Sequence, residues 1–589
     1  MSTQNNSFEP TRWSLDALLA ASEGPVVDEA IAELEAATAA IEALRPQLSP
    51  DLSADAFADM IETTERFSRA ANRLGAYGQL WFTEDTQNQA ALGFMGKMEQ
   101  LVTEAYNRIL FFGLWWKGLE DEVVERLIAH SGKARYYFEQ ERLFKDHTLE
   151  ENAEQIVNLK NINGVDAIVT IYDMITNKFV FELDVDGEKK ELTRGELMTY
   201  VRSPLPEMRE AAYKEQFRVY DQEASVLAQI YIHRVRDWSS ENLNLRNFTS
   251  PIAVRNLAND IPDEVTNTLL DVCAEQAHIF HRYFKLKAEW LNLPKLRRYD
   301  LYAPLSKSST KKIEYNDAVT MVLDGFQEFS PLVADEARRI FTEGHIDAEI
   351  RPNKRSGAFC ASILPELTPW VLANYSGEPR DVATLAHELG HAIHALLAND
   401  HSVLTFHSAL PMAETASVFS EMLLTDRLLA DESDTAIQRE ILADAVDDIY
   451  ATVLRQAYFV LFERDAHEII ASGGTMKELN ERYLANLQQQ FGDAIELSED
   501  FQQEWICIPH IYHTPFYCYA YSFGQLLALS LYQQYKEQGA EFTPKFLKIL
   551  KYGGSASPNH ILSEAGINMA DPDFWRSGFK VIEQMINRL

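Results

Sequence analysis

The stretch Asp381-Val-Ala-Thr-Leu-Ala-His-Glu-Leu-Gly-His-Ala-Ile-His-Ala-Leu-Leu-Ala398 decides the interpretation of this chain of 589 residues. Its apolar residues recur at the spacing of a half-buried helix, and Asp381 is of a type that caps helix N-termini. His387 and His391 are four positions apart, so both imidazoles lie on one helix face and can reach one metal ion. Glu388 then lies beside the metal, where it can act as general base toward an attacking water.

A third ligand decides the type of metal site. The long zinc motif of the metzincins requires glycine at position 394 and histidine at position 397, whereas this chain has His394 and Leu397, so that class is excluded. The segment 410–423 offers carboxylates instead, because Glu414 and Glu421 are two helical turns apart and face the same way. Two histidines and one glutamate leave the fourth position of a tetrahedral zinc open, as a hydrolase requires. Cobalt and manganese also accept such ligands.

Several blocks of sequence, in order along the chain, carry a resemblance to a known family. They span residues 354–360, 369–375, 384–394, 413–421 and 510–521. Together they resemble the thimet oligopeptidase family of metallopeptidases, in particular its oligoendopeptidase F branch, from around residue 110 to residue 585. The resemblance implies a zinc endopeptidase that cleaves short oligopeptides. It also implies a mainly α, zincin-like fold with a deep substrate channel and a small β-sheet next to the metal helix.

The resemblance further implies roles for individual residues around the metal. One zinc ion per chain would be held by His387, His391 and Glu414. Glu388 would accept the proton of the attacking water and later pass it to the leaving amine. Side chains behind the ligands would orient them, a role expected of Ser417 and Glu421.

Peptide hydrolysis also needs hydrogen-bond donors for the oxyanion, and the segment 510–521 is dense in histidine and tyrosine. By resemblance, we expect His513 and Tyr519 to stabilise the oxyanion. A strand-like stretch precedes the metal helix, and its free edge can bind an extended peptide through backbone hydrogen bonds. The expected substrate-binding residues in these two regions are Gly357, Ala358, Phe359, His510, Tyr512, Tyr517 and Tyr521.

The rest of the chain reads as helical. No proline occurs between Pro50 and Pro204, and apolar residues there recur at helical spacing. One exception is the β-branched and aromatic run from residue 167, which leads to an Asp-Gly turn signal and predicts a small β-hairpin near 167–193. We therefore expect an N-terminal helical module at 1–200 and a mostly helical catalytic domain at 201–589.

Composition limits the possible partners and compartment. The formal net charge of −35 opposes binding to nucleic acid or to an anionic membrane. No apolar run approaches the roughly 20 residues of a membrane span, and the N-terminus lacks the basic and apolar parts of a secretory signal. Four widely spread cysteines favour a reducing compartment over a disulfide framework. We expect a cytoplasmic protein; the sequence does not distinguish a monomer from a homo-oligomer.

Three alternatives remain open at this point. A zinc carboxypeptidase or dipeptidase would use the same chemistry but needs a fixed charge that recognises a peptide terminus. A non-catalytic metal-binding interaction protein would have no use for Glu388. A helical solenoid would show a repeat period, and none is evident in the sequence.

Overall fold

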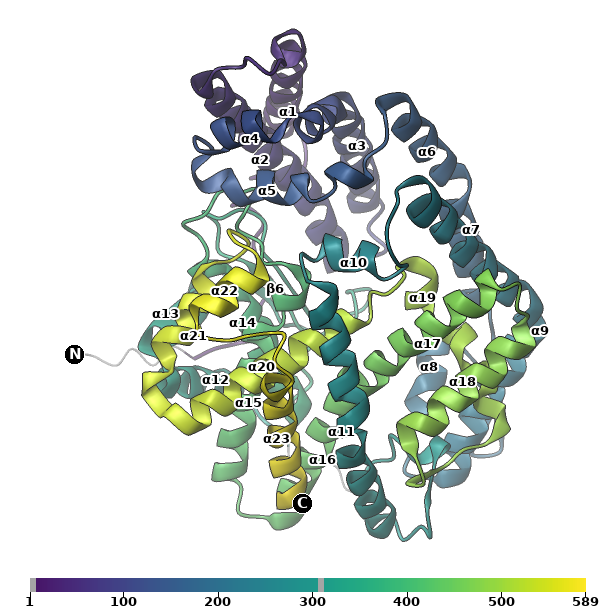
Figure 1. Ribbon diagram of the computed structural model, residues 1–589. Helices are drawn as coiled ribbons and strands as arrows, with labels where there is room; N and C mark the ends of the chain where they lie inside the picture. The colour runs from purple at the N-terminus through teal and green to yellow at the C-terminus, as the bar shows by residue number, and fades with distance from the viewer. Residues whose placement is uncertain (1–6, 306–311) are drawn as a thin grey trace. The chain divides into compact units, whose positions relative to one another are not determined.

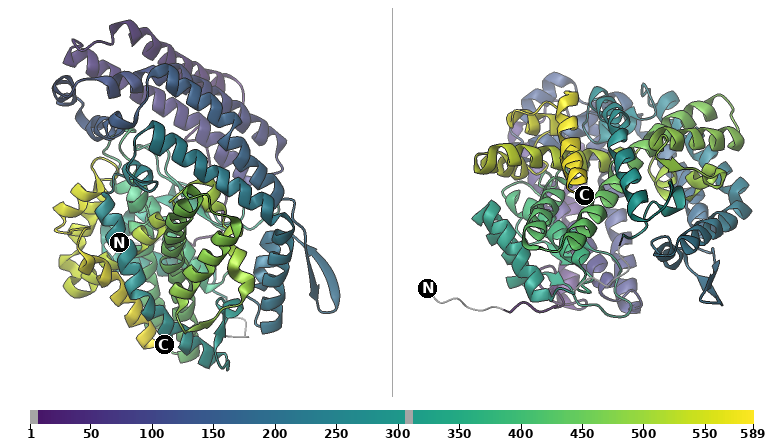
Figure 2. Two further views of the ribbon diagram at one scale, coloured as in Figure 1. Left: turned by 45° about the vertical axis from the view of Figure 1, so that its right-hand side comes forward. Right: turned by 90° about the horizontal axis from the view of Figure 1, so that it is seen from below.

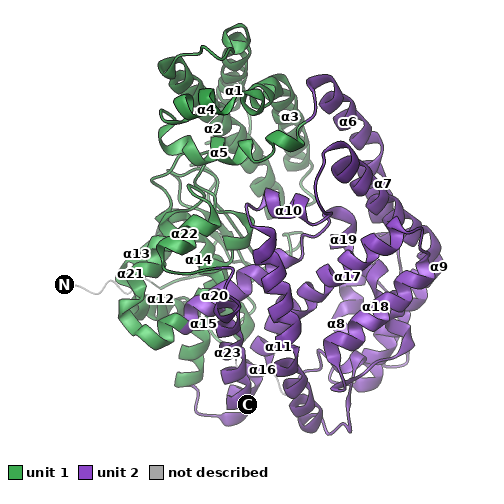
Figure 3. Ribbon diagram, in the orientation of Figure 1, with its two compact units in different colours: residues 1–148, 310–431, 534–568 green, residues 149–309, 432–533, 569–589 purple. Residues whose placement is uncertain are grey.

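Helices dominate the chain, as the sequence predicted, and the strands form only small sheets (Figure 1). This computed structural model describes residues 7–305 and 312–589; the first six residues, which bear on the expectation about a signal sequence, lie outside this range. The chain forms two compact units, each built from separate stretches of sequence (Figure 3). Unit 1 comprises residues 1–148, 310–431 and 534–568. Unit 2 comprises residues 149–309, 432–533 and 569–589.

Unit 1 begins with a helical bundle drawn mostly from the proline-free part of the chain. Its first three helices pack on one another around buried aromatic side chains, among them Phe57, Phe67 and Trp116. The long helices expected here are confirmed, since α2 has 31 residues and α3 has 30. The helices of unit 1 are α1 (Pro25–Leu44), α2 (Ala54–Glu84), α3 (Gln89–Gly118), α4 (Asp121–Ile128), α5 (Arg135–Arg142), α12 (Tyr315–Phe329), α13 (Pro331–Thr342), α14 (Pro379–Leu397), α15 (Thr415–Asp431), α21 (Thr543–Lys551) and α22 (Pro558–Glu564).

A small three-stranded sheet contacts helix α14, which carries the two histidines predicted to bind metal, in unit 1. Its central strand β6 (Trp370–Leu372) pairs in parallel with β4 (Ile346–Asp347) and antiparallel with β5 (Phe359–Ala361). β6 is fully buried, whereas β5 is partly exposed. Within the part of the chain that the structure describes, β5 is an edge strand with no further strand beside it. The expected sheet next to the metal helix is therefore confirmed.

Unit 2 is also mainly helical. Its longest helix, α9, has 33 residues and is contacted by α7 and α17, while α11 packs on α17 and α23. Two-stranded sheets accompany them: β1 (Phe181–Val185) with β2 (Glu188–Leu192), a hairpin that projects on the right of the left-hand view in Figure 2, and β3 (Leu296–Arg297) with β7 (Ile495–Glu496). The helices of unit 2 are α6 (Glu151–Asn163), α7 (Val165–Thr176), α8 (Arg194–Tyr200), α9 (Pro206–Trp238), α10 (Ala253–Ala258), α11 (Asp263–Trp290), α16 (Thr435–Thr452), α17 (Leu454–Ala471), α18 (Met476–Phe491), α19 (Pro509–His513) and α23 (Pro572–Arg588). Helix α20 (Tyr519–Gln538) begins in unit 2 and ends in unit 1.

The structure corrects the start of the hairpin expected near 167–193. The turn is present, because β1 and β2 meet at Asp186 and Gly187, whose positive φ angles of 56° and 84° suit a tight hairpin. The β-branched run before it, however, forms helix α7. Tyr172 of this helix is buried and stacks on Tyr512 with ring centroids 3.9 Å apart. This packing outweighs the weak strand preference of isoleucine, valine and threonine.

The boundary expected near residue 200 does not coincide with the division into units, which first changes after residue 148. The chain returns to unit 1 twice, because segments far apart in sequence pack together, as α14 does with α21. No local pattern records such contacts. In the described ranges, no helix is long and apolar enough to cross a membrane. The four cysteines are free, as expected.

Candidate active site

Helix α14, which carries the predicted metal ligands His387 and His391, starts at a capping box that differs in detail from the expected cap. The N-cap residue is Glu378, with Pro379 at the first helical position. Asp381 lies at the third position, where its carboxylate accepts hydrogen bonds from the backbone N–H of Glu378 at 3.1 Å and of Ser376 at 2.7 Å. This satisfies donors at the helix start and fixes the direction from which α14 leaves the loop.

Gly390, inside the metal motif, allows α14 and α15 to approach closely. A Cβ atom at this position would lie 2.6 Å from Cα of Ser417 and 2.7 Å from the backbone oxygen of Ala416. These distances are shorter than any normal contact, so only glycine fits. The close approach brings the start of α15 next to the two histidines of α14.

Three side-chain atoms converge where the sequence predicted the metal. Nε2 of His387 and Nε2 of His391 are 3.2 Å apart, and Oε2 of Glu414 lies 3.4 Å from the first and 3.5 Å from the second. Ligands at about 2.0–2.2 Å from a tetrahedral zinc are separated by roughly 3.3–3.5 Å. The donor set therefore fits zinc in both chemistry and spacing. The structure brings the three predicted ligands together.

Hydrogen bonds behind the ligands hold their orientation. Nδ1 of His387 lies 2.6 Å from Oε1 of Glu421, and His391 makes a hydrogen bond to the backbone of Ala413. The hydroxyl of Ser417 donates to Oε2 of Glu414 at 2.7 Å. Glu421 and Ser417 therefore each contact one of the predicted metal ligands, as a residue that orients a ligand would.

Ionisation at the site reflects burial among carboxylates. Burial lowers the pKa of His387, but the hydrogen bond and charge of Glu421 outweigh it and bring that pKa to about 9. Burial, together with the neighbouring His387, lowers the pKa of His391. Burial and the charges of Glu414 and Glu421 raise the pKa of Glu388 to about 7. The surplus of negative charge around two imidazoles favours a cation at this point.

Glu388 lies on the wall of a cavity of about 380 Å³ beside the three ligands. Only 6% of the residue is exposed, and its carboxylate accepts a hydrogen bond from the backbone N–H of Cys360 in β5. Ala358 and Phe359, two of the expected substrate-binding residues, also line this cavity, and Gly357 lies exposed just before them. The free edge of β5 is therefore tied directly to the candidate general base.

The remaining predicted residues belong to unit 2, and they differ in how far their side chains are exposed. His513 is exposed, and its Nε2 lies 2.9 Å from Asp173. Tyr519 is fully buried, and its hydroxyl accepts a hydrogen bond from Asn259 at 2.7 Å. Tyr512 is also fully buried. Burial of Tyr519 and Tyr512 counts against the contacts with substrate that we expected of them.

The other predicted aromatic residues of this segment form a partly exposed cluster. The ring of His510 stacks at 6.4 Å from that of Tyr517, and Tyr521 meets both rings edge-on at 6.0 and 5.2 Å. Tyr519 and Tyr521 both lie at the start of helix α20, where side chains two positions apart point to different sides of the helix. This geometry explains why Tyr519 is buried and Tyr521 is partly exposed.

The residues of the metal cavity that sequence reasoning did not assign to the site include His394, Phe406 and His407. His394 follows His391 by three positions, so the helical spacing that identified the ligands also placed it on nearly the same face. Burial lowers its pKa to about 4, so it is neutral. Phe406 and His407 come from the loop after α14, for which no local signal exists.

Comparisons with known proteins identify the family of this chain. Residues 199–581 match the model described as Peptidase family M3. The chain is 29% identical over 422 residues to the chromosomal oligoendopeptidase F of Lactococcus lactis subsp. cremoris, covering 71% of this chain and 69% of that protein. It is 25% identical over 550 residues to oligopeptidase PepF of Bacillus subtilis, covering 91% and 81%. A solved structure of a putative peptidase from Chlamydophila abortus shares the fold, with a TM-score of 0.87, 24% identity, and 98% and 97% coverage.

Proposed function

Because this chain belongs to peptidase family M3, we propose that it is a zinc-dependent endopeptidase that hydrolyses internal bonds of short oligopeptides. One observation carries the proposal: two imidazole nitrogens and a carboxylate oxygen lie 3.2–3.5 Å apart with Glu388 buried beside them. The names of the relatives, oligoendopeptidase F and oligopeptidase, support the oligopeptide substrate and the oligoendopeptidase F branch.

In the proposed reaction His387, His391 and Glu414 would hold the zinc, which when bound would polarise the scissile carbonyl and acidify the attacking water. Glu388 would accept the proton of that water. It would then give this proton to the leaving amine. Glu421 and Ser417 would keep His387 and Glu414 in place through the hydrogen bonds described above.

Stabilisation of the oxyanion remains a prediction for the segment 510–521. Among its side chains, exposure favours His510, Tyr517, Tyr521 and His513 over the buried Tyr519 and Tyr512. Single substitutions distinguish them, because loss of an oxyanion donor lowers kcat by about 100- to 1000-fold with little change in KM. Tyr517→Phe and Tyr521→Phe are expected to show such a loss if they act as donors, and Tyr519→Phe would instead lower stability.

The edge of β5 supports the expected binding of an extended peptide. Cys360 donates its backbone N–H toward Glu388, and Ala358 and Phe359 line the same cavity. A peptide that pairs with this edge would therefore pass the general base. Backbone pairing gives affinity without a strong demand on side chains, which fits an enzyme that accepts many peptides.

The test is hydrolysis of a mixture of unstructured peptides and one folded protein by the purified chain, with products identified by mass spectrometry. Internal cleavage of the peptides alone would support the proposal. Removal of residues from one end would support the alternative of a carboxypeptidase or dipeptidase. Absence of any cleavage by protein with a full complement of zinc would support a non-catalytic metal-binding protein.

A further inference from the structure

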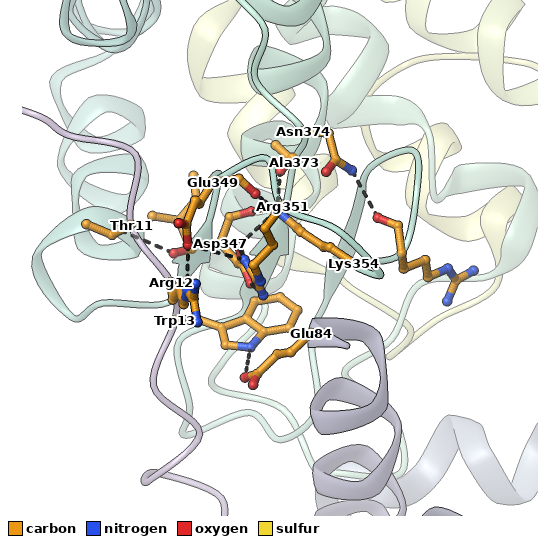
Figure 4. Close-up of polar contacts among 12 residues, drawn as sticks. Thr11, Arg12, Trp13, Glu84, Asp347, Glu349, Arg351, Lys354, Ala373 and Asn374 are labelled. Carbon is orange, nitrogen blue, oxygen red and sulfur yellow. Dashed lines mark hydrogen bonds and ion pairs between the residues drawn. The ribbon is translucent and has the colours of Figure 1, made fainter. Parts of the chain in front are cut away.

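The loop between β4 and β5, residues 348–358, is fixed by a buried lysine (Figure 4). The ammonium group of Lys354 donates to the backbone oxygens of Asp347, Glu349 and Ala373 at 3.0, 2.9 and 2.7 Å, and lies 2.8 Å from the carboxylate of Asp347. The side chains of Lys354 and Asp347 have no exposed surface. A buried and fully bonded charge pair of this kind defines one loop conformation, because any other would leave a charge unpaired.

Further contacts hold both ends of the loop. Asn374 donates from its side-chain nitrogen to the backbone oxygens of Arg355 and Gly357 at 3.0 and 2.7 Å. The N-terminal segment runs beside β4, where the backbone oxygen of Thr11 accepts from Ala348 at 2.9 Å. These bonds fix the loop, and with it the start of β5, where Ala358 and Phe359 line the metal cavity.

Arg355 is the one side chain of this loop whose charge is left without a partner. Its backbone N–H donates to the oxygen of Thr83 at 3.0 Å, but its side chain is exposed. The guanidinium lies 5.2 Å from the centre of the Phe359 ring and makes no ion pair or hydrogen bond with another described residue. The chain has 89 acidic and 54 basic residues, so it contains enough carboxylates to pair with every arginine. This one lies over the ring of Phe359, a residue that lines the metal cavity and whose ring is also 6.1 Å from that of Trp13.

From this arrangement we propose that Arg355 binds a carboxylate of the peptide substrate, either its C-terminal α-carboxylate or an acidic side chain. The inference rests on the proposed function. A peptide paired with β5 passes Phe359, and the guanidinium lies over the ring of this residue. Arginine donates two parallel hydrogen bonds to a carboxylate, and a cation–π contact leaves these donors free. Arg355 is thus a specificity-determining residue, carried on a loop that is already rigid.

The test compares matched peptides of one sequence: a free C-terminal acid, the C-terminal amide, and versions in which an internal Glu is replaced by Gln. We expect wild type to prefer one carboxylate over its amide by roughly tenfold in kcat/KM, as one charge-assisted hydrogen-bonded pair provides. Arg355→Gln should abolish the preference, and the loss should appear mainly in KM. Arg338→Gln, an exposed arginine of α13, is the matched control and should keep it.

The preference that Arg355→Gln loses identifies the group that Arg355 binds. If the variant loses the preference for a free C-terminal acid, Arg355 binds the α-carboxylate. If it loses the preference for internal Glu over Gln, Arg355 binds an acidic side chain. Equal rates for all matched peptides in wild type, or an unchanged preference in Arg355→Gln, would overturn the proposal. Arg355→Lys, which keeps the charge but not the paired donors, should retain only part of the preference.

A binding experiment separates this inference from the proposed function. The Kd values of the same peptides are measured by fluorescence polarisation on Glu388→Gln protein, with and without the added Arg355→Gln change. If wild type hydrolyses nothing, yet the acid peptide binds about tenfold more tightly than the amide and the double variant loses that difference, Arg355 binds carboxylate and the peptidase assignment fails. If the acid and amide peptides bind equally tightly while wild type cleaves peptides, the peptidase assignment is supported and the role of Arg355 is rejected.

Discussion

At the scale of single residues, His387 shows how the site divides its tasks. One ring nitrogen faces His391 and Glu414, and the other lies 2.6 Å from Glu421. The imidazole therefore has one orientation and one nitrogen to offer a metal. Glu414 and Glu421 are seven positions apart, so one short segment contains both the proposed third ligand and the carboxylate that contacts the proposed ligand His387.

We predict that Glu421→Gln weakens metal binding without abolishing it. The amide keeps a hydrogen bond to Nδ1 but removes the negative charge that increases the basicity of the ring, and such changes cost roughly 10- to 100-fold in affinity. Competition with a zinc-sensitive dye would measure the dissociation constant. Glu414→Gln, which removes a ligand oxygen's charge directly, should have the larger effect; a greater loss in Glu421→Gln would show that the two roles are reversed.

Sequence patterns predicted the ligands because a helix repeats at a known interval, so His387, His391 and Glu388 needed no tertiary information. The aromatic segment was different. Tyr512 and Tyr519 are buried while Tyr517 and Tyr521 are partly exposed. Which tyrosine is buried depends on where α20 begins and what packs against it, and neither is encoded in the local spacing.

At the scale of elements, the contact between α14 and α15 determines whether the ligands meet. Its closest point is Gly390, where a Cβ would lie within 3 Å of the backbone of Ala416 and Ser417. The metal motif allows any residue at this position in principle. In this chain the neighbouring helix leaves room for a hydrogen atom alone.

We predict that Gly390→Ala separates the two helices and lowers both stability and metal affinity. Overpacking of this kind typically costs about 1–3 kcal/mol. Gly75→Ala in α2 is the matched control, since a Cβ there meets nothing within 4 Å and should stabilise the helix by about 0.5–1 kcal/mol. Thermal unfolding and zinc titration of both variants would check this; a neutral Gly390→Ala would mean that the helices are farther apart in solution.

Helix α17 carries a second element-scale prediction, at Glu463. This residue is fully buried, its Oε1 accepts the backbone N–H of Phe516 at 3.0 Å, and burial raises its pKa to about 8. Between pH 4.5 and about pH 8, the Glu463 carboxyl is therefore protonated in the folded protein and ionised in the unfolded chain, where its pKa has the ordinary value of 4.5. Stability contributed by this protonation decreases as the pH rises from about 4.5 to about 8.

Glu463→Gln removes that dependence while keeping an acceptor for Phe516. The difference in Tm between the variant and wild type should therefore be more favourable to the variant at pH 8.5 than at pH 5. Differential scanning calorimetry at the two pH values measures the difference. An identical Tm shift at both values would show that the carboxyl does not change its protonation on folding.

The helix at 165–176 marks the limit of element prediction from sequence. Its β-branched residues favoured a strand, and only the packing of Tyr172 on Tyr512, which is 340 residues away, reveals the helix. By contrast, α2, α3 and α9 were expected because their apolar spacing extends over more than eight turns. Long regular patterns survive tertiary packing, and short ambiguous ones are decided by it.

At the scale of the whole molecule, the chain alternates between two units, so segments that join late in the sequence complete unit 1 around α14. A bound metal would link α14 to the start of α15 within that unit. Ligand binding to the folded state alone stabilises it by mass action, by about 2.7 kcal/mol at a free concentration 100 times Kd.

We predict that chelation lowers Tm and abolishes peptide hydrolysis together, and that stoichiometric zinc restores both. The matched control is His387→Ala, whose Tm should not respond to chelator or zinc. Metal content by atomic emission and Tm by differential scanning fluorimetry provide the two readouts. Full activity after complete removal of metal would rule out the proposed chemistry.

The central claim is that Glu388 drives hydrolysis at a metal held by His387, His391 and Glu414, and Glu388→Gln tests it most directly. We expect the variant to fold and retain one zinc per chain, while kcat on short peptides decreases by about 100- to 10,000-fold, as the loss of a general base requires. Wild-type activity in a fully metallated Glu388→Gln protein would contradict the account.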